Sequence, residues 1–197
     1  MVGSGAHRAD SEDLLPIPDA PLRGMDDLLA LFHEAEKPPE QWRVGTEAER
    51  IAIGAADGAL LPYDGPVSVV AIFDRLIRDH GWEPKRERPD GPIIALRRGD
   101  GSVTLEPGSQ IELSGAPFRS IYDGQAESDA HWADLAPVIE ELGLVWLAVG
   151  SHPFGSAEEL GWVPKMRYGV MKDYMPTRGT MAADMMTKTC TVQANLE

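Results

Sequence analysis

The sequence predicts an α+β domain with a mainly antiparallel sheet and flanking helices. Between residues 82 and 114, short strand-like runs are separated by turns at Pro89-Asp90-Gly91 and Gly99-Asp100-Gly101, which is typical of a meander of antiparallel strands. Apolar residues recur at helical spacing on both sides of this segment. Because the strands follow one another in the meander, a doubly wound parallel sheet is not expected.

Helices are expected where apolar residues recur three and four positions apart. The clearest is Ser68 to His80, because Ser68 can cap its first turn and Gly81 stands where a C-terminal cap glycine belongs. The other expected helices cover residues 24–36, 119–142 and 167–174. Strands are expected at residues 41–53, 82–88, 93–97, 102–105, 110–114, 144–150 and 187–196, and the Gly- and Pro-rich residues 151–165 are expected to be irregular.

The charge balance limits the classes of partner. The chain of 197 residues has 18 basic and 32 acidic residues, giving a formal net charge of −14. Nucleic acids and acidic membranes bind basic patches, so neither is expected as a partner. A phosphate ligand stays open, because metal ions and a few arginines can reverse the sign of the charge within a site.

The same residues suggest a location. Cys190 is the only cysteine, so no disulfide can form within the chain, which favours a reducing compartment. Residues 1–22 have no apolar core, and we expect a disordered arm there rather than a signal peptide. The longest apolar run, Leu144 to Val149, is too short to span a bilayer, and a cytoplasmic protein is therefore expected. The chain ends at Asn195-Leu196-Glu197, inside a strand pattern, and we expect it to be part of a longer protein.

Pairs of polar side chains stand two residues apart in three predicted strands. The pairs are Glu47 with Glu49, Gln110 with Glu112, and Gln193 with Asn195. Successive side chains of a strand point to opposite faces, so the members of each pair share a face. Carboxylates gathered on one face repel each other, and at neutral pH they hold either protons or cations. Oxygen ligands suit Mg²⁺ or Mn²⁺, so a metal–nucleotide enzyme is the leading hypothesis.

Each pair also has an ordinary alternative. A Glu-x-Glu pair is more often the solvent side of an edge strand, but here Ile51 and Ile53 continue the face of the glutamates, which favours a cavity. Glu106 and Glu112 flank Pro107-Gly108, and a proline in a strand marks an edge or a bulge, which often re-aims side chains near active sites. The two amides of the last strand, taken alone, are equally compatible with ordinary backbone pairing.

The C-terminal third contains the remaining candidates. Arg167 beside Tyr168 suits a substrate carboxylate, although a surface ion pair is the more frequent role of a lone arginine. The methionines that follow are expected mainly to fill gaps in the core. His152 follows a predicted strand and is the one histidine of interest, while Cys190 is expected to be a buried, inert thiol.

Taken together, these stretches resemble the plant and proteobacterial type of glutamate–cysteine ligase. The resemblance rests on residues 43–49 (RVGTEAE), 105–117 (LEPGSQIELSGAP), 166–168 (MRY), 173–176 (DYMP) and 189–196 (TCTVQANL), in the order of the family. The glutamate-proline-glycine block is long and specific. Residues 41–197 are covered, and the N-terminal arm lies outside the resemblance.

The resemblance implies a catalytic domain similar to that of glutamine synthetase, with a curved antiparallel sheet around a metal-rich funnel, of which residues 23–197 are the N-terminal portion. It implies the ATP-dependent joining of the γ-carboxyl of L-glutamate to the amine of L-cysteine through an acyl phosphate, the first step towards glutathione. By this resemblance the metals, Mg²⁺ or Mn²⁺, are held by Glu47, Glu49, Glu106 and Glu112. Gln193 and Asn195 complete the metal or phosphate environment, and Arg167, Tyr168 and Met175 border the amino-acid pocket, with Arg167 also taking part in catalysis.

Two departures from the family keep alternatives open. Members of the family are longer than this chain, and plant members carry regulatory disulfides that Cys190 alone cannot form internally. Another ATP-dependent carboxylate–amine ligase of the same fold, or a ligand-binding module without turnover, would carry the same carboxylates. The residues predict no oligomeric state.

Overall fold

A computed structural model describes residues 21 and 23–196, and it confirms the α+β class and the antiparallel sheet. The chain divides into two units, residues 1–41 and 42–197. The first contains helix α1 (Met25–Ala35), whose apolar Met25 and Phe32 are exposed, and the short 3-10 helix η1 (Pro39–Gln41). The disordered arm expected at residues 1–22 lies outside the described residues, apart from Pro21.

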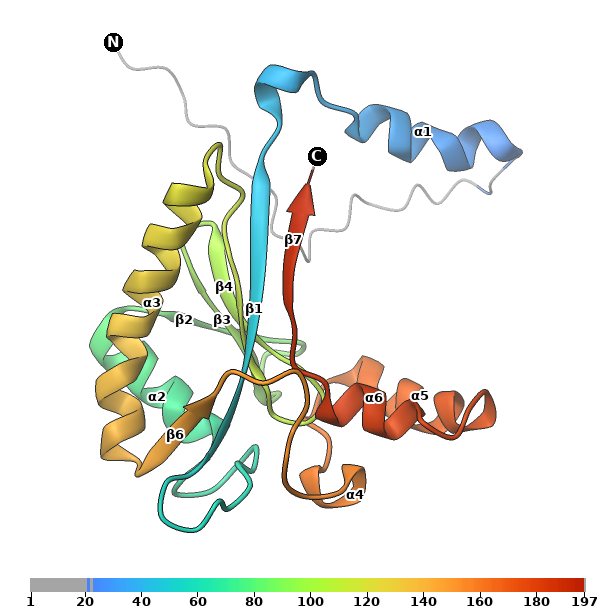
Figure 1. The fold of residues 1–197 in the computed structure, drawn as a ribbon. Coiled ribbons are helices and arrows are strands. Elements are labelled where there is room, and N and C mark those ends of the chain that lie inside the picture. Colours follow the sequence, from blue (N-terminus) through green and yellow to red (C-terminus); the bar gives the residue numbers. More distant parts are fainter. Residues whose placement is uncertain (1–20, 22, 197) are drawn as a thin grey trace. The chain divides into compact units, whose positions relative to one another are not determined.

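The second unit is built on an antiparallel sheet in the order β2-β3-β4-β5-β1-β6, with β7 also paired to β1 (Figure 1). The strands are β1 (Val44–Gly54), β2 (Glu83–Arg86), β3 (Ile93–Arg98), β4 (Gly101–Leu105), β5 (Ile111–Ser114), β6 (Leu144–Leu147) and β7 (Val192–Leu196). Strand β1 is the longest, and it pairs with β7 over its first half and with β6 over its second. Figure 1 shows β2 lying across the direction of β1, so the sheet is strongly twisted between these two strands.

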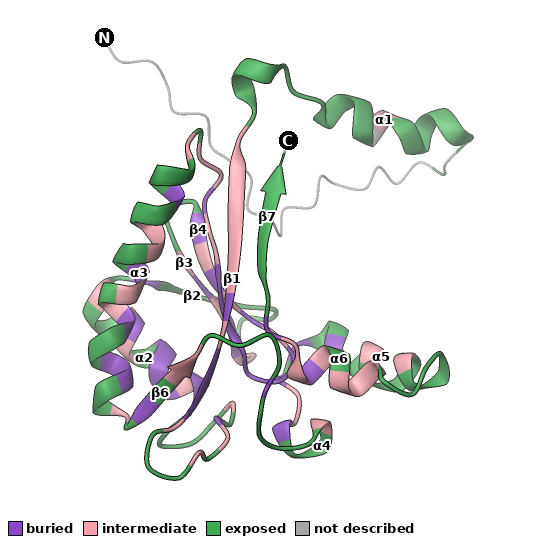
Figure 2. Ribbon diagram, in the orientation of Figure 1, coloured by how far each residue is buried: buried purple, intermediate pink, exposed green. Residues whose placement is uncertain are grey.

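Helices α2 (Val69–His80) and α3 (Ile121–Glu141) form one core with the sheet. Ser68 caps α2, since its Oγ accepts a hydrogen bond from the Ala71 amide at 3.1 Å, and Gly81 ends the helix with a φ of 69°. Leu96, Val103, Leu105 and Ile111 of the sheet are buried against residues of both helices, among them Ile72, Phe73, Leu76, Leu135, Val138 and Ile139. Figure 2 shows buried residues on α2, α3 and the central strands, whereas β7 is exposed throughout.

The C-terminal segment differs from the prediction in two places. Helix α4 (Ala157–Leu160) lies within the residues expected to be irregular, where Ser156 and Glu159 form a capping box. Helix α6 (Ala182–Lys188) covers the first residues of the strand expected at 187–196, which begins only at Val192. The contacts of α6 with α4 outweigh the strand preference of the threonines. Helix α5 (Met166–Tyr174), followed by the 3-10 helix η2 (Met175–Thr177), agrees with the prediction.

Cys190 and His152, two further residues singled out in the sequence, are both buried in the structure. Cys190 is buried, and burial raises the pKa of its thiol to about 11, so it is protonated at neutral pH and is an inert thiol, as expected. His152 is also buried, and its Nδ1 accepts a hydrogen bond from the Phe154 amide at 3.2 Å. Within the part of the chain that the structure describes, no helix is both long and apolar enough to cross a membrane.

Candidate functional site

Strand register places the predicted carboxylates on one face of the sheet. Glu49 of β1 stands directly opposite Glu112 of β5, and Glu112 stands opposite Thr104 of β4. Glu47 lies opposite Ser114 on one side and Gln193 on the other. Directly paired residues of antiparallel strands share a face, so these side chains together form an acidic and hydroxyl-rich surface.

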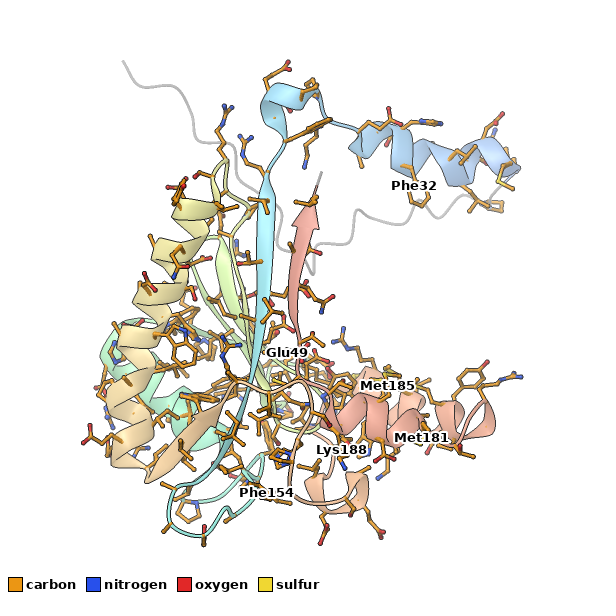
Figure 3. The ribbon with its side chains drawn as sticks, in the orientation of Figure 1. Phe32, Glu49, Phe154, Met181, Met185 and Lys188 are labelled. Carbon is orange, nitrogen blue, oxygen red and sulfur yellow. The ribbon has the colours of Figure 1, made fainter. Side chains whose placement is uncertain are left out.

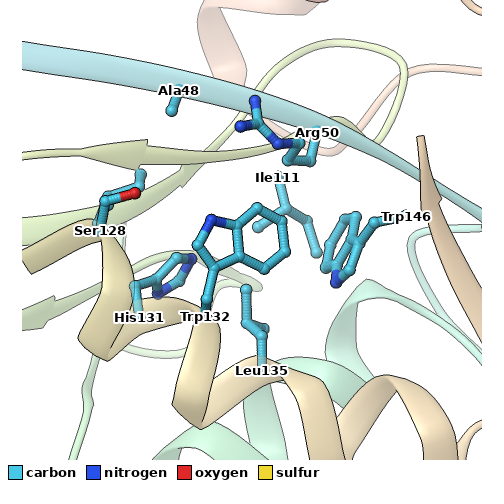
Figure 4. A pocket seen from close by; sticks show the side chains of 9 residues that line it. Ala48, Arg50, Ile111, Ser128, His131, Trp132, Leu135 and Trp146 are labelled. Atoms are coloured by element: carbon cyan, nitrogen blue, oxygen red, sulfur yellow. The ribbon is translucent and has the colours of Figure 1, made fainter. Parts of the chain in front are cut away.

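Residues in alternate positions face the helices instead. Ala48 and Arg50 of β1 and Ile111 of β5 line a small cavity together with side chains of α3 and β6 (Figure 4). His131 in this cavity is buried, and its Nδ1 has no hydrogen-bond partner within the described part of the chain. Burial lowers the pKa of His131 to about 4, so the ring is neutral. The Arg50 guanidinium lies over the Trp132 ring, 5.3 Å from its centre. This cavity belongs to the core, on the face opposite the carboxylates.

The carboxylate of Glu49 is held by the chain entering β7. The Thr191 amide donates to its Oε2 at 2.8 Å and the Thr191 hydroxyl to its Oε1 at 2.9 Å, and Glu49 is 6% exposed. Figure 3 shows Glu49 partway along β1, where the segment leading into β7 comes alongside. Each carboxylate oxygen has a second lone pair, so these bonds orient Glu49 without exhausting its ability to bind a cation.

The other two strand carboxylates are oriented in the same way. Glu112 accepts hydrogen bonds from the hydroxyls of Thr104, at 3.0 Å, and Ser114. Glu47 is half-buried and accepts from the Asn195 amide at 2.9 Å. Among the described residues, the Gln193 side chain is joined to the cluster by one hydrogen bond, which it donates to the Thr191 hydroxyl at 3.2 Å. Both predicted amides of β7 therefore support the carboxylates.

Glu106 lies just past the end of β4, in the tight turn that returns to β5. The Ser109 amide donates to the Glu106 carbonyl at 3.1 Å, and Ser109 has a φ of 69°, an unusual conformation for a residue with a side chain. Burial, together with the negative charges of Glu112 and Glu49, raises the pKa of Glu106 to about 7. The positive charges of Lys165 and Arg167 act in the opposite direction. Glu106 therefore belongs to the same electrostatic cluster as the strand carboxylates.

The turn itself is wedged against the end of α6. A Cβ placed on Gly108 would lie 2.0 Å from the Thr187 carbonyl oxygen, so only glycine fits there. The buried Gln110 side chain donates to the carbonyls of Thr187, at 3.0 Å, and Thr189, at 2.6 Å. This turn therefore fixes the segment that brings Thr191 to Glu49.

Arg167 and Tyr168 reach the cluster from α5. Tyr168 is 2% exposed, and its hydroxyl donates to the Leu105 carbonyl at 2.9 Å. Arg167 donates to the Tyr168 hydroxyl at 3.1 Å. Met175 stands at the start of η2, half-buried, and among the described residues no hydrogen bond or ring contact joins its side chain to the carboxylates.

The residues that could hold a divalent cation are limited to pairs of carboxylates. Among the described residues, no three Asp, Glu, His or Cys side chains lie close enough together to hold a metal ion. Mg²⁺ does not require such a cage, because it usually binds one or two carboxylates and completes its shell with water and phosphate oxygens. Glu49 and Glu112, which stand opposite each other on neighbouring strands, are the two carboxylates that could hold such an ion.

Sequence reasoning missed the hydroxyl donors and Lys165. Thr104, Ser114 and Thr191 each stand two residues from a predicted site residue, so the spacing that selected Glu106, Glu112 and Gln193 would also have selected them. Lys165 is 9% exposed, and its ammonium group donates to the Leu105 carbonyl at 2.7 Å. No local pattern marks Lys165, since its burial arises only when α5 meets the end of β4.

The fold and the site define an α+β domain whose antiparallel sheet carries Glu47, Glu49 and Glu112 on one face. Residues 43–197 match the model of glutamate-cysteine ligase family 2 (GCS2), and the chain belongs to this family. It is 36% identical over 172 residues to the chloroplastic glutamate–cysteine ligase of Brassica juncea, covering 87% of this chain and 32% of that protein. The chloroplastic enzyme of Nicotiana tabacum is 37% identical with the same coverage, and that of Solanum lycopersicum is 34% identical over 100% of this chain and 38% of that protein.

These comparisons confirm the family resemblance and correct one expectation. The chain spans about a third of the length of the curated relatives that it matches. The expectation of a cytoplasmic location is wrong, because these relatives are named as chloroplastic proteins. The absence of a disulfide and of a signal peptide pattern does not distinguish the cytoplasm from another reducing compartment, which is why composition led to the wrong location.

Proposed function

We propose that this chain forms part of an enzyme that joins the γ-carboxyl of L-glutamate to the amine of L-cysteine at the expense of ATP. Membership of the glutamate-cysteine ligase family supports the reaction class. The observation that carries the proposal is the pairing of Glu49 with Glu112 on a polar sheet face that also includes Glu106. The relatives are named for this reaction, and their names are the basis for the two amino acids.

The residues of the chain have separate tasks in this proposal. Glu49 and Glu112 would hold Mg²⁺ or Mn²⁺, with Glu47 and Glu106 contributing charge nearby. A bound cation neutralises phosphoryl oxygens and aligns the reacting groups. Arg167 has donors available beyond the bond to Tyr168, so its guanidinium can grip a substrate carboxylate. Hydrogen bonds from Thr191 and from Thr104 keep the carboxylates in place when no cation is bound.

The direct test is ATP turnover by the natural full-length protein with Mg²⁺ and L-glutamate, in the presence and absence of L-cysteine. Release of ADP that depends on cysteine, with γ-glutamylcysteine formed, is the expected result. Turnover only with another amine would replace L-cysteine by that amine and would indicate a sister ligase. Binding of Mg²⁺ and ATP without turnover under any of these conditions would contradict the proposal and indicate a regulatory module.

Glu106 makes a specific prediction about pH. Because the pKa of Glu106 is about 7 in the folded protein, Glu106 is mostly protonated at pH 6 and mostly ionised at pH 8, and a cation held by Glu49 and Glu112 favours the ionised form through its positive charge. We expect the dissociation constant of Mn²⁺, measured by electron paramagnetic resonance without ATP, to fall about tenfold over this range, in proportion to the ionised fraction.

The matched control for this pH prediction is Glu106→Gln, which does not titrate. Its Mn²⁺ affinity should be nearly flat between pH 6 and pH 8. An equally steep pH dependence in this variant would show that another group titrates there and that the charge of Glu106 does not act on the cation.

A further inference from the structure

The hydroxyl group of Tyr168 donates its hydrogen bond to another group of the protein. A phenol has one O–H donor, and that of Tyr168 points to the Leu105 carbonyl at 2.9 Å. With the residue 2% exposed, and its ring in edge contact with Trp162 at 6.3 Å between centres, little of the side chain faces a ligand. This placement suits a supporting role behind Arg167, and the place at the amino-acid pocket that the family resemblance implies for Tyr168 stays a prediction.

Arg167, by contrast, depends on Tyr168 for its orientation. Among the described residues, the Tyr168 hydroxyl is the one hydrogen-bond partner of the Arg167 side chain, at 3.1 Å. The guanidinium also lies over the Tyr168 ring, 5.0 Å from its centre. Tyr168 therefore sets the direction in which the remaining N–H groups of the Arg167 guanidinium point.

The Leu105 carbonyl joins this arrangement to the carboxylate cluster. Pairing of β4 with β3 ends at Val103, so the carbonyl of Leu105 lies beyond the last pair and receives side-chain donors from Tyr168 and Lys165 instead. The residue that follows is Glu106. The peptide group between Leu105 and Glu106 therefore positions the backbone of Glu106 directly. Through Tyr168, the same peptide group also positions the guanidinium of Arg167.

We propose that Tyr168 is a positioning residue, whose hydroxyl holds Arg167 at a fixed place relative to Glu106 so that the guanidinium meets the carboxylate of an acidic amino-acid substrate. This inference rests on the proposed function, since it takes Arg167 as the group that binds the substrate carboxylate. It also predicts what the tyrosine does not do: it does not select the amine that attacks in the second half of the reaction.

Tyr168→Phe in the natural full-length protein tests this role, because the change removes one oxygen atom and keeps the ring. The Leu105 carbonyl keeps its bond from Lys165, so the thermal midpoint should change little. We expect the dissociation constant of L-glutamate, measured by calorimetry without ATP, and its KM to rise about tenfold, as for the loss of one hydrogen bond to a charged group. The kcat and the KM of the amine should stay within about twofold.

The same helix offers a matched control. Tyr174 is exposed, accepts a hydrogen bond from Arg178 at 2.9 Å and has the Arg178 guanidinium 5.0 Å from its ring centre, so it repeats the tyrosine–arginine pair on an exposed part of the chain. Tyr174→Phe should leave L-glutamate binding unchanged. In an Arg167→Ala background, Tyr168→Phe should have no further effect on L-glutamate affinity, because the hydroxyl acts through the arginine.

Three results would overturn the inference. If Tyr168→Phe alters the KM or the choice of the amine while L-glutamate binding stays normal, the tyrosine lines the amine pocket. If the variant binds L-glutamate as the wild-type protein does, the hydroxyl does not position Arg167, and the proposed function stands unaffected. If the wild-type protein itself binds no L-glutamate, the proposed function fails and the inference fails with it.

Discussion

Glu49→Gln is expected to lower metal-dependent ATP turnover of the natural full-length protein by at least about 100-fold, the scale seen when one preorganised electrostatic group is removed from a site. The substitution keeps the size of the side chain, and the oxygen of the new amide can still accept from the Thr191 amide. It removes the negative charge that stands directly opposite Glu112. A neutral amide is a weak ligand for Mg²⁺, so the KM for Mg²⁺ should rise together with the fall in kcat.

A charge change elsewhere on the sheet provides the control for this experiment. Glu83 of β2 is exposed at the sheet edge, and Glu83→Gln should leave turnover and the KM for Mg²⁺ within about twofold of the wild-type values. Activity that is unchanged in Glu49→Gln would refute the assignment of Glu49 to the cation. Equal losses in both variants would mean that the site responds to net charge rather than to this carboxylate.

Gly108→Ala should destabilise the fold more than any other change proposed for this chain. We expect it to lower the free energy of unfolding by at least about 3 kcal/mol, the upper part of the range for overpacked positions. The added Cβ would lie 2.0 Å from the Thr187 carbonyl oxygen and 2.9 Å from its carbonyl carbon. Both are backbone atoms of α6, so the clash cannot be relieved by turning a side chain. The segment that carries Thr191 must move away, and the Glu49 carboxylate loses its two donors.

Thermal unfolding and amide hydrogen exchange of residues 187–196 measure this effect. We expect a midpoint several degrees lower than in the wild-type protein and faster exchange in β7. Gly169→Ala is the matched control, because nothing lies within 4 Å of its added Cβ and position 169 is inside α5, where alanine stabilises a helix. Normal protection of β7 in Gly108→Ala would show that the turn and α6 adjust independently.

Much of the fold could be predicted from local patterns. The helix at 68–80 was predicted within one residue, because its cap residues Ser68 and Gly81 act on their own first and last turns. The meander strands were predicted because turn residues and alternation are both short-range signals. Helix α6 was missed since its stability comes from α4 and from the wedged turn at Gly108, neither of which leaves a pattern in residues 182–188.

The sequence by itself determined which side chains share a face, since the two-residue period of a strand is a property of the chain alone. It therefore placed Glu47 with Glu49 and favoured oxygen ligands for a cation. Only the tertiary structure decided that Glu49 meets Glu112 and that Thr191, 142 residues away, supplies its donors. The raised pKa of Glu106 and the buried hydroxyl of Tyr168 likewise exist only after strands and helices have assembled. Register, burial and charge proximity join residues distant in the chain, and no local spacing encodes them.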